Sequence, residues 1–147
     1  MIEEGDLDTG TLEVAADDAG LGRILAFIGF ACDRAGLAAA VGHDLRLAVE
    51  EVCTNIIRHG YAPGAPGPIR IAFREGRGTY EVVVEDRAPA FDPATAPAPD
   101  LTSGWGERRP GGHGWSLVRA MVDQVLYQPV PPRGNRVTLV KSKPGRP

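Results

Sequence analysis

Three polar side chains recur at intervals of four residues in a stretch that otherwise has the pattern of a core-facing helix. They are Glu51, Asn55 and His59, within the sequence EEVCTNIIRHGY at residues 50–61. Because four residues turn an α-helix by about 400°, the three side chains should stack along one side. That side borders the apolar stripe of the helix, which distinguishes it from an ordinary solvated face of Glu/Lys pairs.

These residue types have a functional and a structural interpretation. The oxygen of Asn55 is a ligand that Mg²⁺ accepts, and Mg²⁺ usually also keeps several waters and binds phosphate oxygens. Glu51, one turn away, can act as a general base toward a water or a hydroxyl group. In the structural alternative, Asn55 is hydrogen-bonded to a neighbouring loop at a partly exposed edge, and His59 caps carbonyl groups at the helix end. Both interpretations stay open on this helix alone.

Two further motifs favour the functional interpretation. The sequence VVVEDRAPAFDP, at residues 82–93, ends a predicted strand with Asp86, where a carboxylate can accept a hydrogen bond from an exocyclic amine. The sequence GGHGWSLVRAMVDQV, at residues 111–125, places glycines directly before a predicted helix. Backbone N–H groups at such a helix start can bind an anion, and the helix dipole assists them. The three motifs in this order are far more specific than any one of them.

The composition indicates one globular domain over residues 1–147. Hydrophobic residues make up 43% and charged residues 24% of the chain, and the formal net charge of −3 argues against a basic surface for nucleic acid. No apolar run approaches the roughly 20 residues of a membrane helix, and the acidic start is unlike a signal peptide. We therefore expect a cytoplasmic protein that binds neither nucleic acid nor membrane, with Cys32 and Cys53 as reduced, buried thiols.

The order of elements predicts an α+β fold, a two-layer sandwich with helices on one face of a mixed, mainly antiparallel sheet. Apolar residues at helical spacing predict helices over residues 21–36, 41–60 and 115–122. β-prone runs predict strands over residues 11–15, 69–75, 79–86, 124–130 and 135–142. Residues 87–112 are rich in Pro, Gly and Ala, and a loop of this length is typical of a lid or a binding loop.

Together these motifs resemble the GHKL ATPases, which share the Bergerat nucleotide-binding fold. Within that superfamily the sequence is most similar to the anti-sigma-factor serine/threonine kinases of the RsbW and SpoIIAB type, from about residue 12 to residue 141. LRLAVEEVCTNIIRHGY matches the N box of the family, with its Glu-x-x-x-Asn-x-x-x-His spacing intact. EDRAPAFDP falls at the first glycine box, GGHGWSLV at the second, and GNRVTLVKS resembles the closing strand.

The resemblance implies ATP and Mg²⁺ as cofactors. It makes Asn55 the metal ligand, Glu51 the general base toward a serine or threonine of a partner, and Asp86 the residue that binds the adenine amino group. Arg23 would contact the partner protein, and a flexible ATP lid at about residues 92–112 would cover the nucleotide. The other nucleotide-binding positions that it implies are His59, Ala88, Ala90, Phe91, Gly112, His113, Gly114, Trp115, Ser116, Leu117 and Asn135.

The sequence departs from the family pattern at the first glycine box, which usually reads Asp-x-Gly-x-Gly. Ala88 and Ala90 stand at the glycine positions. A positive φ at Ala88 would cost about 1 kcal/mol, whereas an ordinary φ would make the change nearly neutral. We also expect the charge of Arg87 to favour the ionised form of Asp86. Asn135 stands where many relatives have Thr, and it can still hydrogen-bond toward the adenine or its water.

The resemblance implies a kinase and anti-sigma factor that phosphorylates a STAS-type anti-anti-sigma protein, sequesters a sigma factor and forms a homodimer through its sheet. The alternative is a non-catalytic nucleotide-binding module that only binds its protein partners, which Ala88 and Ala90 favour. A detached catalytic domain of a sensor histidine kinase is a third interpretation. It is less favoured because the pattern predicts no long helical hairpin with a phosphoacceptor histidine.

Overall fold

The computed structural model describes residues 7–95 and 114–144. The helices and strands lie where the periodicity predicted them, with ends that differ by a few residues. In chain order they are β1 (Leu7–Ala15), α1 (Asp18–Ala35), α2 (Ala39–Asn55), the π-helical turn η1 (Ile56–Gly60), β2 (Pro68–Glu75), β3 (Thr79–Asp86), the 3₁₀ turn η2 (Pro93–Thr95), α3 (Gly114–Met121), β4 (Gln124–Pro129) and β5 (Asn135–Ser142).

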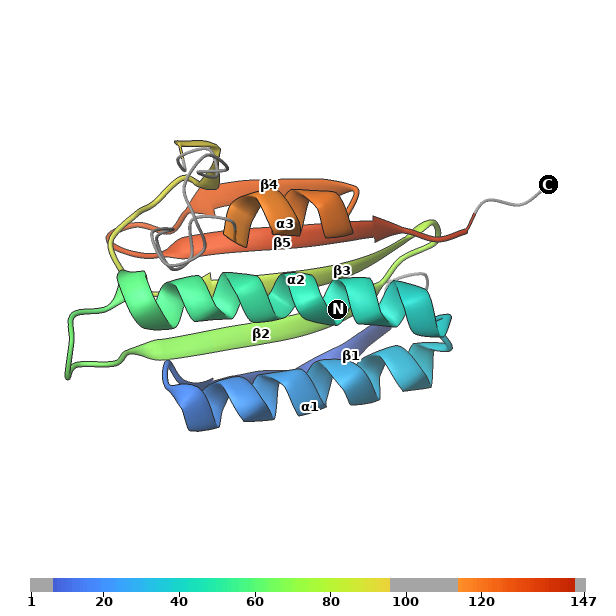
Figure 1. Cartoon of the computed structure of the whole chain (residues 1–147), viewed down its shortest axis with the longest axis horizontal. Coiled ribbons are helices and arrows are strands. Elements are labelled where there is room, and N and C mark those ends of the chain that lie inside the picture. Colours follow the sequence, from blue (N-terminus) through green and yellow to red (C-terminus); the bar gives the residue numbers. More distant parts are fainter. Residues whose placement is uncertain (1–6, 96–113, 145–147) are drawn as a thin grey trace, which may run out of the picture.

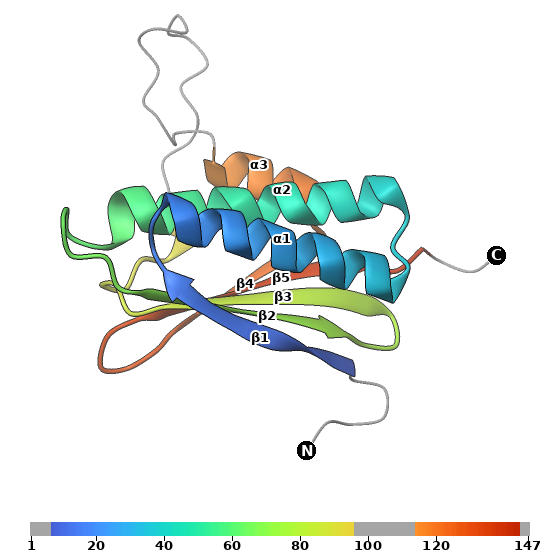
Figure 2. The same cartoon turned by 90° about the horizontal axis from the view of Figure 1, so that it is seen from below.

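The strands form one five-stranded sheet in the order β1-β2-β3-β5-β4. Helices α1, α2 and α3 all lie on one face of this sheet, and no helix of the described residues covers the other face (Figure 1, Figure 2). The predicted α+β class and the two-layer arrangement are therefore confirmed. Every pairing between the described strands is antiparallel, so the parallel component of the expected mixed sheet is absent from this part of the chain.

The core lies between the helices and the sheet. Helix α2 and the start of η1 contribute the apolar stripe expected from the sequence, because Leu45, Val49, Val52 and Ile56 are all buried. The strands contribute every second residue, as the pleat requires. The buried strand residues in this core are Val14, Ile69, Ile71, Phe73, Tyr80, Val82, Val84, Val137 and Leu139. This packing fixes α2, and with it the polar residues on its flank, against the middle of the sheet.

The start of α1 shows how closely the helices approach the sheet. The Asp17 side chain accepts a hydrogen bond from the Gly20 N–H at 2.7 Å and so caps the helix. A Cβ atom at Gly20 would lie 2.0 Å from the Ala15 carbonyl oxygen, which belongs to β1. Only glycine allows this turn from β1 into α1, so Gly20 sets the position of α1 on the sheet.

Lys141 connects the sheet to the helical layer at the C-terminal end of α3. Its ammonium group donates a hydrogen bond to the Met121 carbonyl, the last residue of α3, at 2.7 Å. It also pairs with the Asp44 carboxylate on α2 at 3.3 Å. A cation at a helix C-terminus is favourable because it meets the negative end of the helix dipole. Lys141 on β5 therefore fixes the C-terminal end of α3 relative to α2.

The helix-free face of the sheet carries small and charged side chains in rows across the strands. Thr11, Ala72, Val83, Thr138 and Leu126 are consecutive cross-strand neighbours in one such row. Charged residues flank this row, among them the ion pair of Arg136 with Glu85. Among the described residues, no helix combines the length and the apolar character that crossing a bilayer requires.

A pair of glycine substitutions on α1 tests the packing of this helix. We expect Gly20→Ala to lower the free energy of unfolding by about 2–3 kcal/mol, because the new methyl group collides with the Ala15 carbonyl. Gly22→Ala, two residues along the same helix, meets nothing within 4 Å. It should raise the free energy of unfolding by up to about 1 kcal/mol, since alanine favours the helix. Chemical denaturation measures both, and equal stability of the two variants would contradict the close approach.

Candidate functional site

The end of α2 carries the first two residues of the polar stripe. The Asn55 amide donates a hydrogen bond to the Glu51 carbonyl oxygen at 3.1 Å, which engages the nitrogen end of the carboxamide. The neighbouring Val52 and Cys53 are buried, so the stripe borders the core as predicted. The pKa of Glu51 is raised, chiefly by burial and then by the charge of Glu50. A raised pKa brings a carboxylate closer to the range in which a general base works.

The helix widens immediately after Asn55 into the π-helical turn η1, Ile56–Gly60. Turns of this kind are rare and occur frequently at functional sites. His59 lies in this turn and is exposed. Glu51 and Asn55 lie one turn apart in regular α-helix, as predicted. The role of His59 stays a prediction.

Helix α3 begins directly against this pair of residues. A Cβ atom at Gly114 would lie 2.9 Å from the Asn55 amide nitrogen and 3.4 Å from a Glu51 carboxylate oxygen. Gly114 is buried, and its lack of a side chain allows the helix start to approach α2. The N box and the end of the second glycine box, more than fifty residues apart in sequence, are therefore neighbours in the fold.

Asp86 ends β3 as a buried carboxylate that is 7% exposed. Its Oδ1 atom accepts hydrogen bonds from the Ala88 N–H at 2.8 Å and from the Asn135 amide at 2.9 Å. Burial raises its pKa, and these two hydrogen bonds oppose the rise. The Arg87 charge, which we expected to favour the ionised form, is not among the causes of this shift, because the Arg87 side chain is exposed and burial has the largest effect on the pKa of Asp86.

The charge of this carboxylate also affects a second buried group. Burial and the charge of Asp86 raise the pKa of the Cys53 thiol on α2 to about 12. The thiol therefore stays protonated next to the carboxylate. Both cysteines are free and buried, as the sequence predicted.

The segment after β3 adopts an ordinary backbone despite the missing glycines. Among the described residues every positive φ belongs to a glycine, so Ala88 and Ala90 carry no left-handed strain. Ala88 is buried, and its methyl group would be 3.3 Å from a Cβ atom at Gly60, where the π-helical turn ends. The side chain that Ala88 adds thus occupies space that Gly60 leaves open. Ala88 therefore has an ordinary φ, and the cost of about 1 kcal/mol expected for a positive φ does not arise.

Asn135 opens β5 directly opposite Asp86 and is 6% exposed. Its amide group donates to Asp86 and to the Pro89 carbonyl, and its oxygen accepts from the Phe91 N–H and the Tyr127 hydroxyl. The sequence interpretation missed the role of Tyr127. The only local indication of that role was its position two residues before the end of β4.

The sequence interpretation also missed Tyr61, which follows the π-helical turn. Its hydroxyl accepts a hydrogen bond from the Arg87 N–H at 2.7 Å and donates to the Pro68 carbonyl at 2.6 Å. Gly67 packs against the Tyr61 ring, since a Cβ atom there would lie 2.3 Å from it. Tyr61 thereby holds the end of β3 to the start of β2.

The remaining predicted residues take different positions. The Trp115 side chain packs in the core and is 8% exposed, so a ligand contact at this residue would use its backbone N–H. Leu117 is half-buried, whereas Ser116, Ala90 and Phe91 are exposed. Arg23 is exposed on α1. Gly112, His113 and the predicted lid beyond residue 95 lie outside the described residues.

The contact between α3 and α2 brings together groups that can bind an anion and a cation. The N-terminus of α3 supplies the positive end of a helix dipole next to a carboxamide and a carboxylate. Among the described residues, no group of three or more His, Cys, Asp and Glu side chains could hold a metal ion. A metal at Asn55 would therefore take most of its ligands from water or from a bound molecule, which is the habit of Mg²⁺.

Comparison with known proteins places this arrangement in a family context. The serine/threonine-protein kinase BtrW of Bordetella bronchiseptica is 32% identical over 91 residues, which cover 62% of this chain and 64% of that protein. The serine-protein kinase RsbW of Bacillus licheniformis is 29% identical over 108 residues, with 63% of this chain and 64% of that protein covered. This chain thus spans less than two thirds of the length of these relatives.

Solved structures show the same fold. The RsbU and RsbW domains of Rv1364c from Mycobacterium tuberculosis match 94% of this chain and 34% of their own chain, with a TM-score of 0.62 and 22% identity. The chain also matches the histidine kinase-like ATPase domain over residues 14–141, which includes the N box and both glycine boxes. Since this match covers most of its length, the chain belongs to the histidine kinase-like ATPase domain family.

Proposed function

We propose that this protein is an ATP- and Mg²⁺-dependent serine/threonine-protein kinase that acts as a partner-switching anti-sigma factor. The observation that carries the proposal is the approach of Gly114, at the start of α3, to Asn55 and Glu51 on α2. Asp86 ends β3 at the same end of the molecule (Figure 1). Phosphate, metal and purine contacts would thus come from three motifs gathered around one cleft.

The residues fit the cofactors that the family uses. The Asn55 oxygen would hold Mg²⁺, and the N-terminus of α3 would bind phosphate oxygens. The adenine amino group would donate to Oδ2 of Asp86, because both described hydrogen bonds to this carboxylate go to Oδ1. The metal, when bound, would supply positive charge that offsets the negative charge of the phosphates. His59, Ala90 and Phe91 would border the nucleotide at the mouth of the cleft.

Glu51 would act on the protein substrate. Its carboxylate accepts the proton of a serine or threonine hydroxyl as the hydroxyl oxygen bonds to the γ-phosphorus and the bond to the β-phosphate oxygen breaks. The raised pKa of Glu51 suits this role. Since phosphoryl transfer has a loose transition state, positioning and charge stabilisation supply most of the rate enhancement.

The proposed partners are a STAS-type anti-anti-sigma protein as the substrate and a sigma factor as the sequestered protein. The exposed face of α1 supports a protein contact, because Phe30 is 63% exposed and Arg34 stacks over its ring at 5.7 Å. Arg23 lies two turns from Phe30 on the same side of the helix. A homodimer through the helix-free face is part of this proposal, supported by the apolar side chain of Leu126, which is 51% exposed in the row of residues on that face.

Replacing Asp86 by Asn separates nucleotide binding from stability. The Asn oxygen keeps both described hydrogen bonds, whereas the acceptor for an amine is lost. ATP affinity should fall by about ten- to a hundredfold, the usual effect of one hydrogen bond to a charged group. The free energy of unfolding at pH 7 should stay equal or rise, because the variant no longer buries a charge.

The pH dependence of the free energy of unfolding tests whether burial of the Asp86 charge destabilises the parent protein. The pKa of Asp86 is raised in the folded protein, so the parent becomes more stable as the pH falls from the raised value toward about 3.9. The stability difference between Asp86→Asn and the parent should narrow over that range in denaturation experiments. Asp33→Asn, on the exposed face of α1, is the matched control. A variant that keeps full ATP affinity in calorimetry would contradict the role of Asp86.

A methyl group at Gly114 tests the contact between α3 and α2. We expect Gly114→Ala to displace the Asn55 amide and to weaken Mg²⁺·ATP binding on the order of tenfold, while the fold stays cooperative. Gly22→Ala adds the same group to open space and should leave binding unchanged. Calorimetric titration measures both. Unchanged affinity in Gly114→Ala would remove the approach of α3 as an argument for the site.

A transfer assay separates the kinase from the non-catalytic module. With labelled ATP and a STAS-domain protein, Glu51→Gln should lower phosphate transfer at least a hundredfold while ATP binding persists, because the general base alone is lost. Glu13→Gln, an exposed position on β1 that does not affect the pKa of Glu51, is the control. Stable partner binding by the parent protein without any transfer would support the module instead.

A further inference from the structure

The Asn135 side chain uses its full hydrogen-bonding capacity inside the protein. Its amide donates to Asp86 Oδ1 at 2.9 Å and to the Pro89 carbonyl at 3.1 Å. Its oxygen accepts from the Phe91 N–H at 2.8 Å and from the Tyr127 hydroxyl at 2.7 Å. A carboxamide has two N–H donors and two acceptor lone pairs, so these four bonds satisfy it. No capacity remains for the contact with a purine or its water that the sequence predicted.

Tyr127 is the outermost member of this network. It lies on β4, and burial is the main cause that raises the pKa of its hydroxyl. The hydroxyl therefore stays protonated and donates to the Asn135 oxygen. This bond and the bond from the Phe91 N–H both go to the oxygen of the carboxamide, so the nitrogen end points toward the Asp86 carboxylate. Tyr127 thus helps to hold the orientation of Asn135, and Asn135 helps to hold the position of Asp86.

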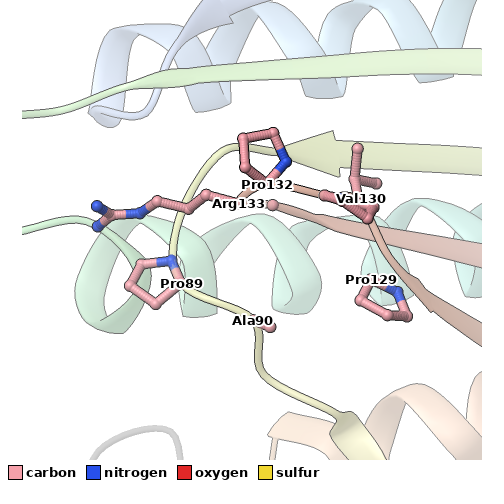
Figure 3. A pocket seen from close by; sticks show the side chains of 8 residues that line it. Pro89, Ala90, Pro129, Val130, Pro132 and Arg133 are labelled. Atoms are coloured by element: carbon pink, nitrogen blue, oxygen red, sulfur yellow. The ribbon is translucent and has the colours of Figure 1, made fainter.

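The network also fastens two segments that border an open cavity of about 500 Å³. Pro89 and Ala90 follow β3 on one side (Figure 3). On the other side Pro129 ends β4, and Val130, Pro132 and Arg133 lie between β4 and β5. Asn135 binds the first segment through the Pro89 carbonyl and the Phe91 N–H. Gly134, next to Asn135, approaches the Asp86 carbonyl so closely that a Cβ atom would lie 2.6 Å from it.

We propose that Asn135, oriented by the Tyr127 hydroxyl, is a positioning residue that holds Asp86 and residues 88–91 in place for a purine base without contacting the nucleotide. This inference rests on the nucleotide-binding function proposed above. In this inference the Asn135 side chain determines the path of the loop after β3. In the usual family pattern, glycines at the positions of Ala88 and Ala90 would determine it. The role of Asn135 also explains how an ordinary backbone there is kept in one conformation.

The test compares Asn135→Ala, Tyr127→Phe and the double variant by calorimetry with Mg²⁺·ATP and with Mg²⁺·tripolyphosphate, which lacks the base. We expect ATP affinity to fall about tenfold in Asn135→Ala and about three- to fivefold in Tyr127→Phe, which keeps the ring but loses one hydrogen bond. The double variant should equal Asn135→Ala, because Tyr127 acts through Asn135. Tripolyphosphate affinity should stay unchanged in all three, whereas a general loss of structure would lower it too.

Hydrogen exchange without nucleotide gives an independent measurement. The Phe91 N–H should lose protection in Asn135→Ala and lose part of it in Tyr127→Phe. Tyr80→Phe is the matched control, because Tyr80 is a buried tyrosine near the opposite end of β3 from Asp86 and should change neither quantity.

The outcomes separate this inference from the proposed function. Unchanged or tighter ATP binding in Tyr127→Phe, with a loss in Asn135→Ala, would mean that Asn135 contacts the base directly and would overturn the inference alone. An equal loss for tripolyphosphate and ATP would also overturn it. A parent protein that binds no ATP would remove the proposed function and the inference together.

Discussion

A carboxylate that is kept from water is the constraint on which this end of the molecule depends. Burial of Asp86 opposes its ionisation, and an ionised group at such a position needs hydrogen-bond donors. The Ala88 N–H and the Asn135 amide supply them. Each donor in turn fixes a piece of backbone, the segment after β3 and the start of β5. The buried charge of Asp86 therefore determines how the surrounding backbone is arranged. An apolar residue at this position would need no hydrogen-bond donors.

Helix α2 combines packing and polar functions because its two faces adjoin. Val49 and Val52 seat the helix on the sheet, while Glu51 and Asn55 occupy the flank that meets α3. The helix could not turn this flank toward solvent without losing its apolar contacts. Packing energy thus holds the polar pair in position, and the transition to a π-helical turn comes immediately after it.

The elements, and the side of α2 that carries Glu51 and Asn55, were predictable because they depend on local patterns. Helical spacing located α1, α2 and α3, and the N-box spacing located Glu51 and Asn55. The network of Asp86 and Asn135 was not predictable in detail, since it joins residues that are 49 positions apart. Its geometry depends on the register of β3 with β5, which no short sequence pattern specifies. The roles of Tyr61 and Tyr127 were missed for the same reason, because each hydroxyl acts on a distant segment.

The attachment of α3 at its far end by Lys141 has a mechanical consequence. The lysine holds the Met121 carbonyl and pairs with Asp44, so the helix is anchored where it ends. Trp115 in the first turn and Val118 in the middle of the helix are buried in the core, so α3 is held along its length as well as at its end. The helix has eight residues and is about 12 Å long. A tilt of about 10° would move its first turn by about 2 Å, so the attachment at Lys141 and the buried Trp115 together keep Gly114 within contact distance of Asn55.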